Sequence, residues 1–138
     1  MKLTNRSEYA LVALSVLARN FNKNIVSAEQ IALQKNIPKG FLQQILFSLK
    51  KAGYVRATKG KDGGYSLVKA PKDISIAEIV RFFEGPLASS TSVSKNFYHP
   101  SPIEEEPGIV NLLAGIRDYV AKTLEATTLE DVVGKRSK

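Results

Sequence analysis

The sequence predicts a mainly α-helical fold that carries one small β-hairpin. Apolar residues recur with the three-to-four-residue spacing of helices over most of the chain. One glycine-rich turn near residue 60 separates two short runs of β-type residues. The chain has 138 residues, of which 43% are hydrophobic, so a single domain with its own core is expected.

The first helix is expected over about residues 6–19. Its apolar face has the positions i, i+3, i+4, i+7 and i+8, namely Tyr9, Val12, Ala13, Val16 and Leu17. Asn5 followed by Glu8 resembles a capping box at its start.

Two further helices follow and are joined by a short turn. Ser27 is expected to cap the first of them, with Gln30 completing the capping box. Pro38 disfavours helix at the residue before it but fits the first turn of a new helix, expected over about 38–52. Gly53 then stands where a helix-ending glycine belongs. This arrangement is typical of a helix-turn-helix.

A β-hairpin is expected directly after these helices, with strands at about 54–58 and 65–68. The turn between them holds three glycines, and Asp62-Gly63 is a strong hairpin signal. A hairpin that follows a helix-turn-helix is a wing, so residues 1–86 are predicted to form a winged helix-turn-helix region.

The remainder divides into a helix of the first region, a loop and a C-terminal region. A helix is expected over about 75–84, capped by Ser75 with Glu78. Residues 87–106 show no period and are expected to be a flexible loop. Residues 107–138 are expected to hold a long helix over about 107–126, then a short helix capped by Thr127 with Glu130. One stripe of the long helix is apolar: Ile109, Leu112, Leu113, Ile116, Val120 and Leu124.

Composition excludes several classes of function. The chain has no cysteine and one histidine, His99, which we interpret as a loop residue. Disulfides, thiol catalysis and zinc fingers are therefore excluded, and no acid–base pair is evident. We expect no enzyme activity, no metal site and no cofactor. No run of about 18 apolar residues is present, so we expect no membrane partner and a cytoplasmic protein.

Charge is divided unevenly along the chain. Residues 1–72 hold 13 Lys and Arg against 3 Asp and Glu, whereas residues 73–138 hold 7 against 10. A basic half followed by a slightly acidic one favours binding to a polyanion. The simpler interpretation is a solvated surface with an accidental imbalance.

The helix at 38–52 is expected to enter the major groove of double-stranded DNA. Its polar face can read bases, because glutamine pairs bidentately with adenine, while lysines and the wing contact phosphates. Phe47 on that face either contacts a thymine methyl or tilts into the first helix, and we favour the second interpretation. The full set of expected DNA-binding residues is Ser27, Lys39, Gln43, Gln44, Ser48, Arg56, Thr58, Lys59, Lys61, Gly63, Gly64 and Tyr65.

The motifs together resemble the Rrf-two family of bacterial winged-helix transcriptional regulators. The resemblance rests on Tyr9-Ala10-Leu11-Val12-Ala13-Leu14, Gly40-Phe41-Leu42-Gln43-Gln44-Ile45-Leu46, Ala52-Gly53-Tyr54-Val55, the wing with Gly63-Gly64-Tyr65, Ile74-Ser75-Ile76-Ala77-Glu78-Ile79 and Thr128-Leu129-Glu130-Asp131-Val132-Val133. It implies a homodimer joined through the stripe of the long helix, and a sequence-specific regulator, usually a repressor.

Two departures from the family pattern matter. Many members hold an iron–sulfur cluster on three cysteines between the fourth helix and the dimer helix, and residues 87–106 here contain none. The effector is therefore expected to be a small molecule or a protein. Gln43 stands where relatives often carry an acidic residue, so the preferred operator is expected to differ accordingly. The alternative function is a protein–protein adaptor that has kept the fold and lost specific DNA binding.

Overall fold

The computed structural model describes residues 2–87 and 101–134, and it consists of helices with one two-stranded hairpin. The N-terminal elements are α1 (Asn5–Arg19), α2 (Ala28–Lys35), α3 (Lys39–Lys51), β1 (Val55–Thr58) and β2 (Gly64–Leu67). They are followed by η1 (Pro71–Asp73), α4 (Ile76–Glu84), η3 (Pro102–Glu105), α5 (Pro107–Ala126) and α6 (Leu129–Gly134). The predicted fold class, mainly helical with a winged helix-turn-helix, is confirmed.

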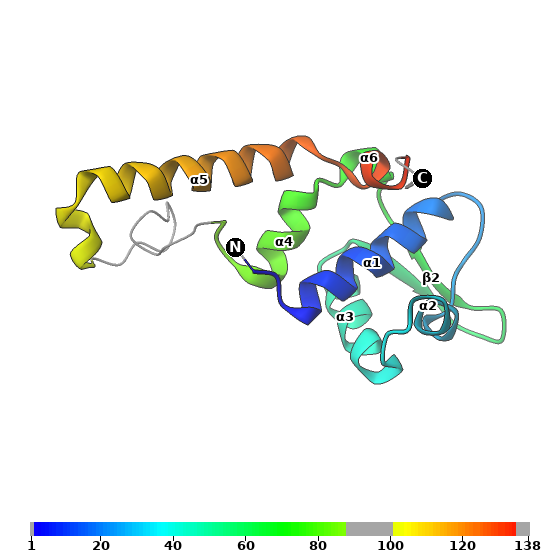
Figure 1. The fold of residues 1–138 in the computed structure, drawn as a ribbon. Coiled ribbons are helices and arrows are strands. Elements are labelled where there is room, and N and C mark those ends of the chain that lie inside the picture. The colour runs from blue at the N-terminus through cyan, green and yellow to red at the C-terminus, as the bar shows by residue number, and fades with distance from the viewer. Residues whose placement is uncertain (1, 88–100, 135–138) are drawn as a thin grey trace.

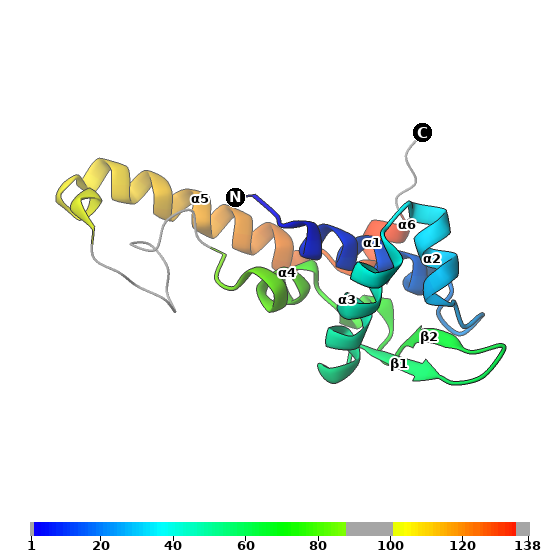
Figure 2. The same ribbon diagram turned by 90° about the horizontal axis from the view of Figure 1, so that it is seen from below.

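The elements form a compact body from which α5 extends as a rod (Figure 1). The C-terminal end of α5 lies beside α4, and the chain then returns to place α6 next to α1. Seen from below, α3 and the hairpin lie on the side of the body away from α5 (Figure 2). The hairpin and α3 are therefore free to meet a partner without α5 in the way.

One apolar core joins α1 to every other part of the body. Leu14 and Leu17 of α1 are fully or almost fully buried, as are Leu42 and Leu49 of α3 and Leu129 of α6. Each such side chain stabilises the fold by about 1.5–3 kcal/mol relative to an exposed position. The core therefore buries one face of α3, and the opposite face points to solvent.

Three helix starts differ from the sequence prediction, and one of them is that of α3, where Pro38 is the N-cap residue and not part of the first turn. Thr4, not Asn5, caps α1, because Asn5 is already helical and the Thr4 hydroxyl accepts from the backbone N–H of Ser7 at 3.4 Å. Glu84 at the end of α4 fixes this cap: its carboxylate accepts from the N–H and the hydroxyl of Thr4, at 2.8 and 2.6 Å, and from the buried hydroxyl of Ser7.

The cap of α6 is one residue later than expected. Thr127 is occupied at the end of α5, where its hydroxyl donates to the Thr123 carbonyl and its own carbonyl accepts from the N–H of Ile76. Thr128 and Asp131 therefore form the reciprocal cap, with bonds of 2.9 and 3.1 Å. The predicted boxes of α2 (Ser27 with Gln30) and α4 (Ser75 with Glu78) are both confirmed.

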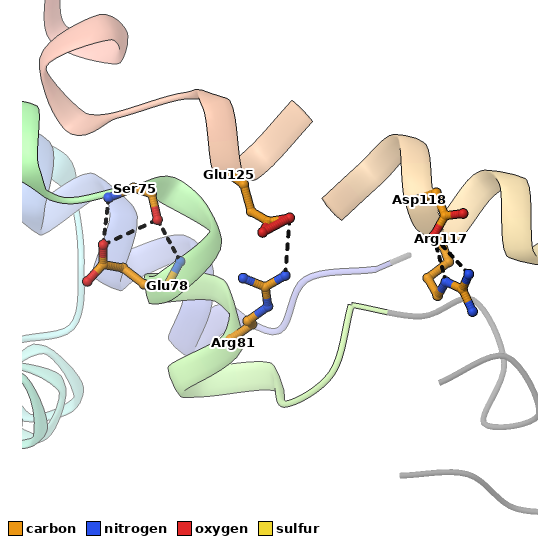
Figure 3. A network of polar contacts seen from close by, with 6 residues as sticks. All are labelled: Ser75, Glu78, Arg81, Arg117, Asp118 and Glu125. Atoms are coloured by element: carbon orange, nitrogen blue, oxygen red, sulfur yellow. Dashed lines mark hydrogen bonds and ion pairs between the residues drawn. The ribbon is translucent and has the colours of Figure 1, made fainter. Parts of the chain in front are cut away.

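Polar contacts tie α4 to its neighbours on two sides. In Figure 3, Glu78 completes the cap at Ser75, and Arg81 reaches Glu125 of α5 at 3.6 Å. Glu78 also accepts from the hydroxyl of Tyr54 at 2.9 Å. Burial, followed by the bond and charge of Glu78, raises the pKa of Tyr54 to about 12. Partial burial opposes ionisation of Glu78, but bonds from Ser75 and Tyr54 outweigh it and hold the pKa of Glu78 below its ordinary value.

Helix α5 spans the predicted residues and has no fully buried side chain. Its largest exposed apolar side chains share one face: Ile109, Leu112, Ile116 and Tyr119 are 44%, 62%, 42% and 74% exposed. Leu113 and Val120 are half-buried, and Leu124 packs against the core of its own chain. The predicted stripe therefore lies partly against the molecule itself, and sequence analysis omitted Tyr119. Within the described residues, no helix is long and apolar enough to cross a membrane.

Candidate nucleic-acid interface

Helix α3 presents one polar face to solvent because its other face is locked into the core. Leu42, Ile45, Leu46 and Leu49 recur at helical spacing and are completely buried. The turn before α3 is tight: Asn36 ends α2 in the left-handed conformation, at φ 54°, and Pro38 is the N-cap residue that precedes α3. The orientation of α3 is thus set by packing.

The outward face of α3 lines an open hollow of about 570 Å³. Its lining is Arg6, Gly40, Phe41, Gln43, Gln44, Phe47 and Ser48. Gln43 and Gln44 are exposed, and Ser48 is half-buried. The structure therefore brings together the three α3 residues that the sequence singled out as base-reading or polar contacts. Arg6 joins them from α1, held over the ring of Phe83 at 5.5 Å, and sequence analysis did not identify it.

Phe47 differs from the interpretation favoured by the sequence. Its side chain is 59% exposed on the polar face and does not turn into α1. The aromatic residue of α3 that packs on α1 is Phe41, whose ring meets Tyr9 edge-on at 5.5 Å. The ammonium group of Lys51 lies over the Phe47 ring at 5.6 Å. Because Phe41 already occupies the contact with α1, Phe47 remains outside.

The wing is an antiparallel hairpin whose exposed charged side chains are mostly basic, with Asp62 as the acidic exception. Val55 pairs with Leu67 at its buried base, and Thr58 pairs with Gly64 near its tip. Arg56, Thr58, Lys59 and Lys61 are all exposed. Positive charge therefore gathers on a hairpin that follows directly from the outward-facing helix α3.

Gly63, Gly64 and Tyr65 have structural reasons for their positions. A Cβ on Gly63 would stand 2.0 Å from the carbonyl oxygen of Thr58, and one on Gly64 would stand 2.5 Å from that of Val26. Tyr65 forms a backbone bridge with Val26 through bonds of 2.8 and 3.0 Å. This bridge attaches the wing to the segment that leads into α2 and so places Ser27 beside the wing.

Lys39 is already paired in the protein alone. Its Nζ lies 2.6 Å from Glu29 Oε1, and both side chains are largely exposed. The hydrogen bond from Lys39, followed by its charge, holds the pKa of Glu29 below its ordinary value. Lys39 therefore has to leave or share this partner to contact a phosphate, and no sequence pattern had indicated the pairing with Glu29. Ser27 is likewise engaged, since its hydroxyl accepts from the N–H of Gln30 at 3.1 Å.

Comparison with known proteins identifies the family. Residues 3–135 match the sequence model of Rrf2, described as an iron-dependent transcriptional regulator. The chain belongs to the Rrf2 family. CymR of Bacillus subtilis, an HTH-type transcriptional regulator, is 33% identical over 136 residues, which are 96% of this chain and 89% of CymR. NsrR of Bacillus licheniformis, also an HTH-type transcriptional regulator, is 33% identical over 135 residues, covering 96% of this chain and 92% of NsrR.

Solved structures give the same picture of an Rrf2 fold. The structure of B. subtilis CymR, described as the global cysteine regulator, superposes with a TM-score of 0.81 at 29% identity and covers 99% of both chains. The structure of the oxidized form of Staphylococcus aureus CymR superposes with a TM-score of 0.82 at 28% identity, and the match covers 100% of both chains. These Rrf2 relatives are regulators of transcription with a helix-turn-helix, which supports a DNA-binding regulator as the function class.

The donor groups of this chain do not fit a cysteine-ligated iron–sulfur cluster. Such clusters are held by cysteine thiolates, and the sequence has none. In residues 2–87 and 101–134, no three His, Asp or Glu side chains gather closely enough to hold a metal ion. His99 and most of the predicted loop lie outside these residues. The residues present therefore do not fit a cluster of that kind.

Proposed function

We propose that this chain is a sequence-specific DNA-binding regulator, acting in the cytoplasm as a homodimeric repressor without an iron–sulfur cluster. The observation that carries the proposal is the exposed polar face of α3 beside a basic wing. A helix of this kind fits the major groove, and the wing can reach the backbone or the minor groove. Family membership supports the same function.

The two elements take different roles in this proposal. Gln43 and Gln44 read base edges from α3, because the amide group of glutamine can donate to N7 and accept from N6 of adenine. Arg56, Lys59 and Lys61 neutralise phosphates and set affinity without reading sequence. The Val26–Tyr65 bridge attaches the wing to the segment before α2, and Gly64 leaves room for this close backbone approach.

The homodimer is proposed to form through α5. Four large apolar side chains stand exposed on a 20-residue helix that extends from the body, a pattern that a second copy of the helix would cover. Ile109, Leu112, Ile116 and Tyr119 are the central contacts, with Leu113 and Val120 at the edge. Leu124 is left out of the interface because it packs on its own core.

A gel shift tests the proposal on the DNA upstream of the protein's own gene. We expect salt-sensitive binding to one segment of that DNA. Lys59→Ala should weaken binding evenly on all sequences and reduce the slope of log K against log salt by about 0.9. Gln43→Ala should instead relax base preference with little change in the slope. Base preference that is unchanged in Gln43→Ala would refute the base-reading role.

A protein–protein adaptor is the second candidate, favoured by one observation. Phe47 places an apolar ring on the face that would otherwise be wholly polar. Capture of a stable protein partner through that face, by a chain that binds no DNA sequence selectively, would support the adaptor and overturn the regulator.

The sensing step is proposed to use a small-molecule or protein effector.

A further inference from the structure

The exposed ring of Phe47 stands among groups that suit nucleic acid. Gln43 and Gln44 lie one turn earlier on the same face, and Lys51 lies one turn later. Phe47 is 59% exposed on this face. A large apolar side chain in water gains free energy when a partner covers it, so this ring adds an apolar contact to a polar face.

The surroundings of the ring favour DNA over a protein as that partner. Lys51 covers the ring from one side at 5.6 Å, and Arg6 lines the same hollow. Within the hollow's lining there is no carboxylate, so its charge is wholly positive and matches phosphates on either side of a groove. An apolar ring between amides and cations matches the major groove, where base edges lie between two phosphate backbones.

Gly40 adds a second geometric feature. It lies two turns before Phe47 on the same face, and a side chain there would meet nothing within 4 Å. The glycine therefore serves no internal contact. Because Gly40 has no side chain, the helix can come closer to the bases at this point. The ring of Phe47 and the glutamines can then reach the floor of the groove.

We propose that Phe47 is a specificity-determining residue that reads the C5-methyl group of a thymine. Thymine is the DNA base whose major-groove edge carries a methyl, and phenylalanine is among the side chains that contact it. The adenine paired with that thymine, or one beside it, presents N6 and N7 to Gln43 or Gln44. One face of α3 thus combines the two recognition chemistries of an A·T pair. The proposal rests on the proposed function, since it names what that same face reads.

Deoxyuridine tests the methyl directly, because it differs from thymidine by that group alone. An operator is first selected from a random duplex library with the full-length protein, and each thymine is then replaced singly by deoxyuridine. Affinity is measured by fluorescence anisotropy. For the wild-type protein we expect deoxyuridine at one position per half-site to weaken binding about fourfold relative to the parent duplex. That is the effect of losing one buried methylene-sized group. For Phe47→Ala we expect weaker binding to the parent duplex and no further loss at that position.

Controls separate this inference from the broader function. Leu33→Ala removes another large exposed side chain, 85% exposed on α2, and should keep the response to deoxyuridine. Phe47→Gln, which introduces a good helix former, provides a second variant, and circular dichroism checks that each variant is folded. A scan in which no thymine responds, or an equal response in wild type and both Phe47 variants, overturns the proposal while leaving DNA binding intact. If selection from the random duplex library enriches no sequence, the proposed function is overturned, and the reading of thymine is overturned with it.

Discussion

Replacement of Gly64 by alanine is the sharpest test of how the wing is held. The new Cβ would stand 2.5 Å from the carbonyl oxygen of Val26 and 2.8 Å from the backbone nitrogen of Ser27. Neither contact can be relieved by a side-chain rotation, since both atoms belong to the backbone. The hairpin therefore has to move away from the segment that precedes α2.

The size of the effect follows from what that movement breaks. The Val26–Tyr65 bridge consists of two backbone hydrogen bonds of 3.0 and 2.8 Å. Each contributes about 1 kcal/mol net, and residual strain adds about 1 kcal/mol, so the free energy of unfolding should fall by about 2–4 kcal/mol. Urea denaturation followed by circular dichroism measures this change.

Gly40→Ala is the matched control, because its Cβ would meet nothing within 4 Å. Alanine is the better helix former, so this variant should equal wild type or gain up to about 1 kcal/mol. If Gly64→Ala and Gly40→Ala lay within about 0.5 kcal/mol of each other, the close approach between wing and Val26 would not constrain the fold, and the reasoning would be refuted.

Three further outcomes are expected. The pKa of Glu84 is held below its ordinary 4.5 by bonds from Ser7 and then Thr4, so its contribution to stability is present above that pH and is lost as pH falls through the lowered value. Glu84→Gln should lower the free energy of unfolding at pH 7 by about 1 kcal/mol and should reduce its fall with decreasing pH. An unchanged fall at acid pH would contradict the contribution of Glu84 to stability. Glu29→Gln should free Lys39 and tighten DNA binding by about threefold with little change in stability, because the pair is exposed to solvent. Weaker binding would show that the pair serves DNA contact. Leu46→Ala, at a completely buried site, should cost about 2–5 kcal/mol in urea denaturation, whereas Val12→Ala, at 36% exposure, should cost under about 1; similar costs would contradict the core assignment.

Local signals in the sequence predicted the elements well where the chemistry is local. The boxes at Ser27 and Ser75 depend on residues three positions apart, and both are present. Helix α5 begins at Pro107, as its proline indicated. The cap at Thr4 was missed because the residue that fixes it, Glu84, is 80 positions away in sequence. Periodicity alone carries no information on such a partner.

The candidate site was predictable in its elements and less so in its individual side chains. Periodicity assigns a residue to a face, but it does not say which neighbour covers that face. Phe47 and Phe41 are both aromatic residues of α3, and only packing shows that Phe41 takes the contact with Tyr9. On α5, Leu124 and Tyr119 border the same stripe, yet the molecule covers the first and exposes the second. Lys39 was expected to be available and is paired with Glu29.

The central claim is that the exposed face of α3 and the basic wing select a DNA sequence. The most direct measurement is the ratio of affinities for a selected duplex and for a scrambled duplex of the same composition, at about 150 mM salt, where specific sites are typically bound 10³-fold or more tightly than non-specific ones. We expect a ratio of about 10³ or greater that collapses when Gln43 and Gln44 are both replaced by alanine. A ratio near 1 for the wild-type protein would contradict the claim.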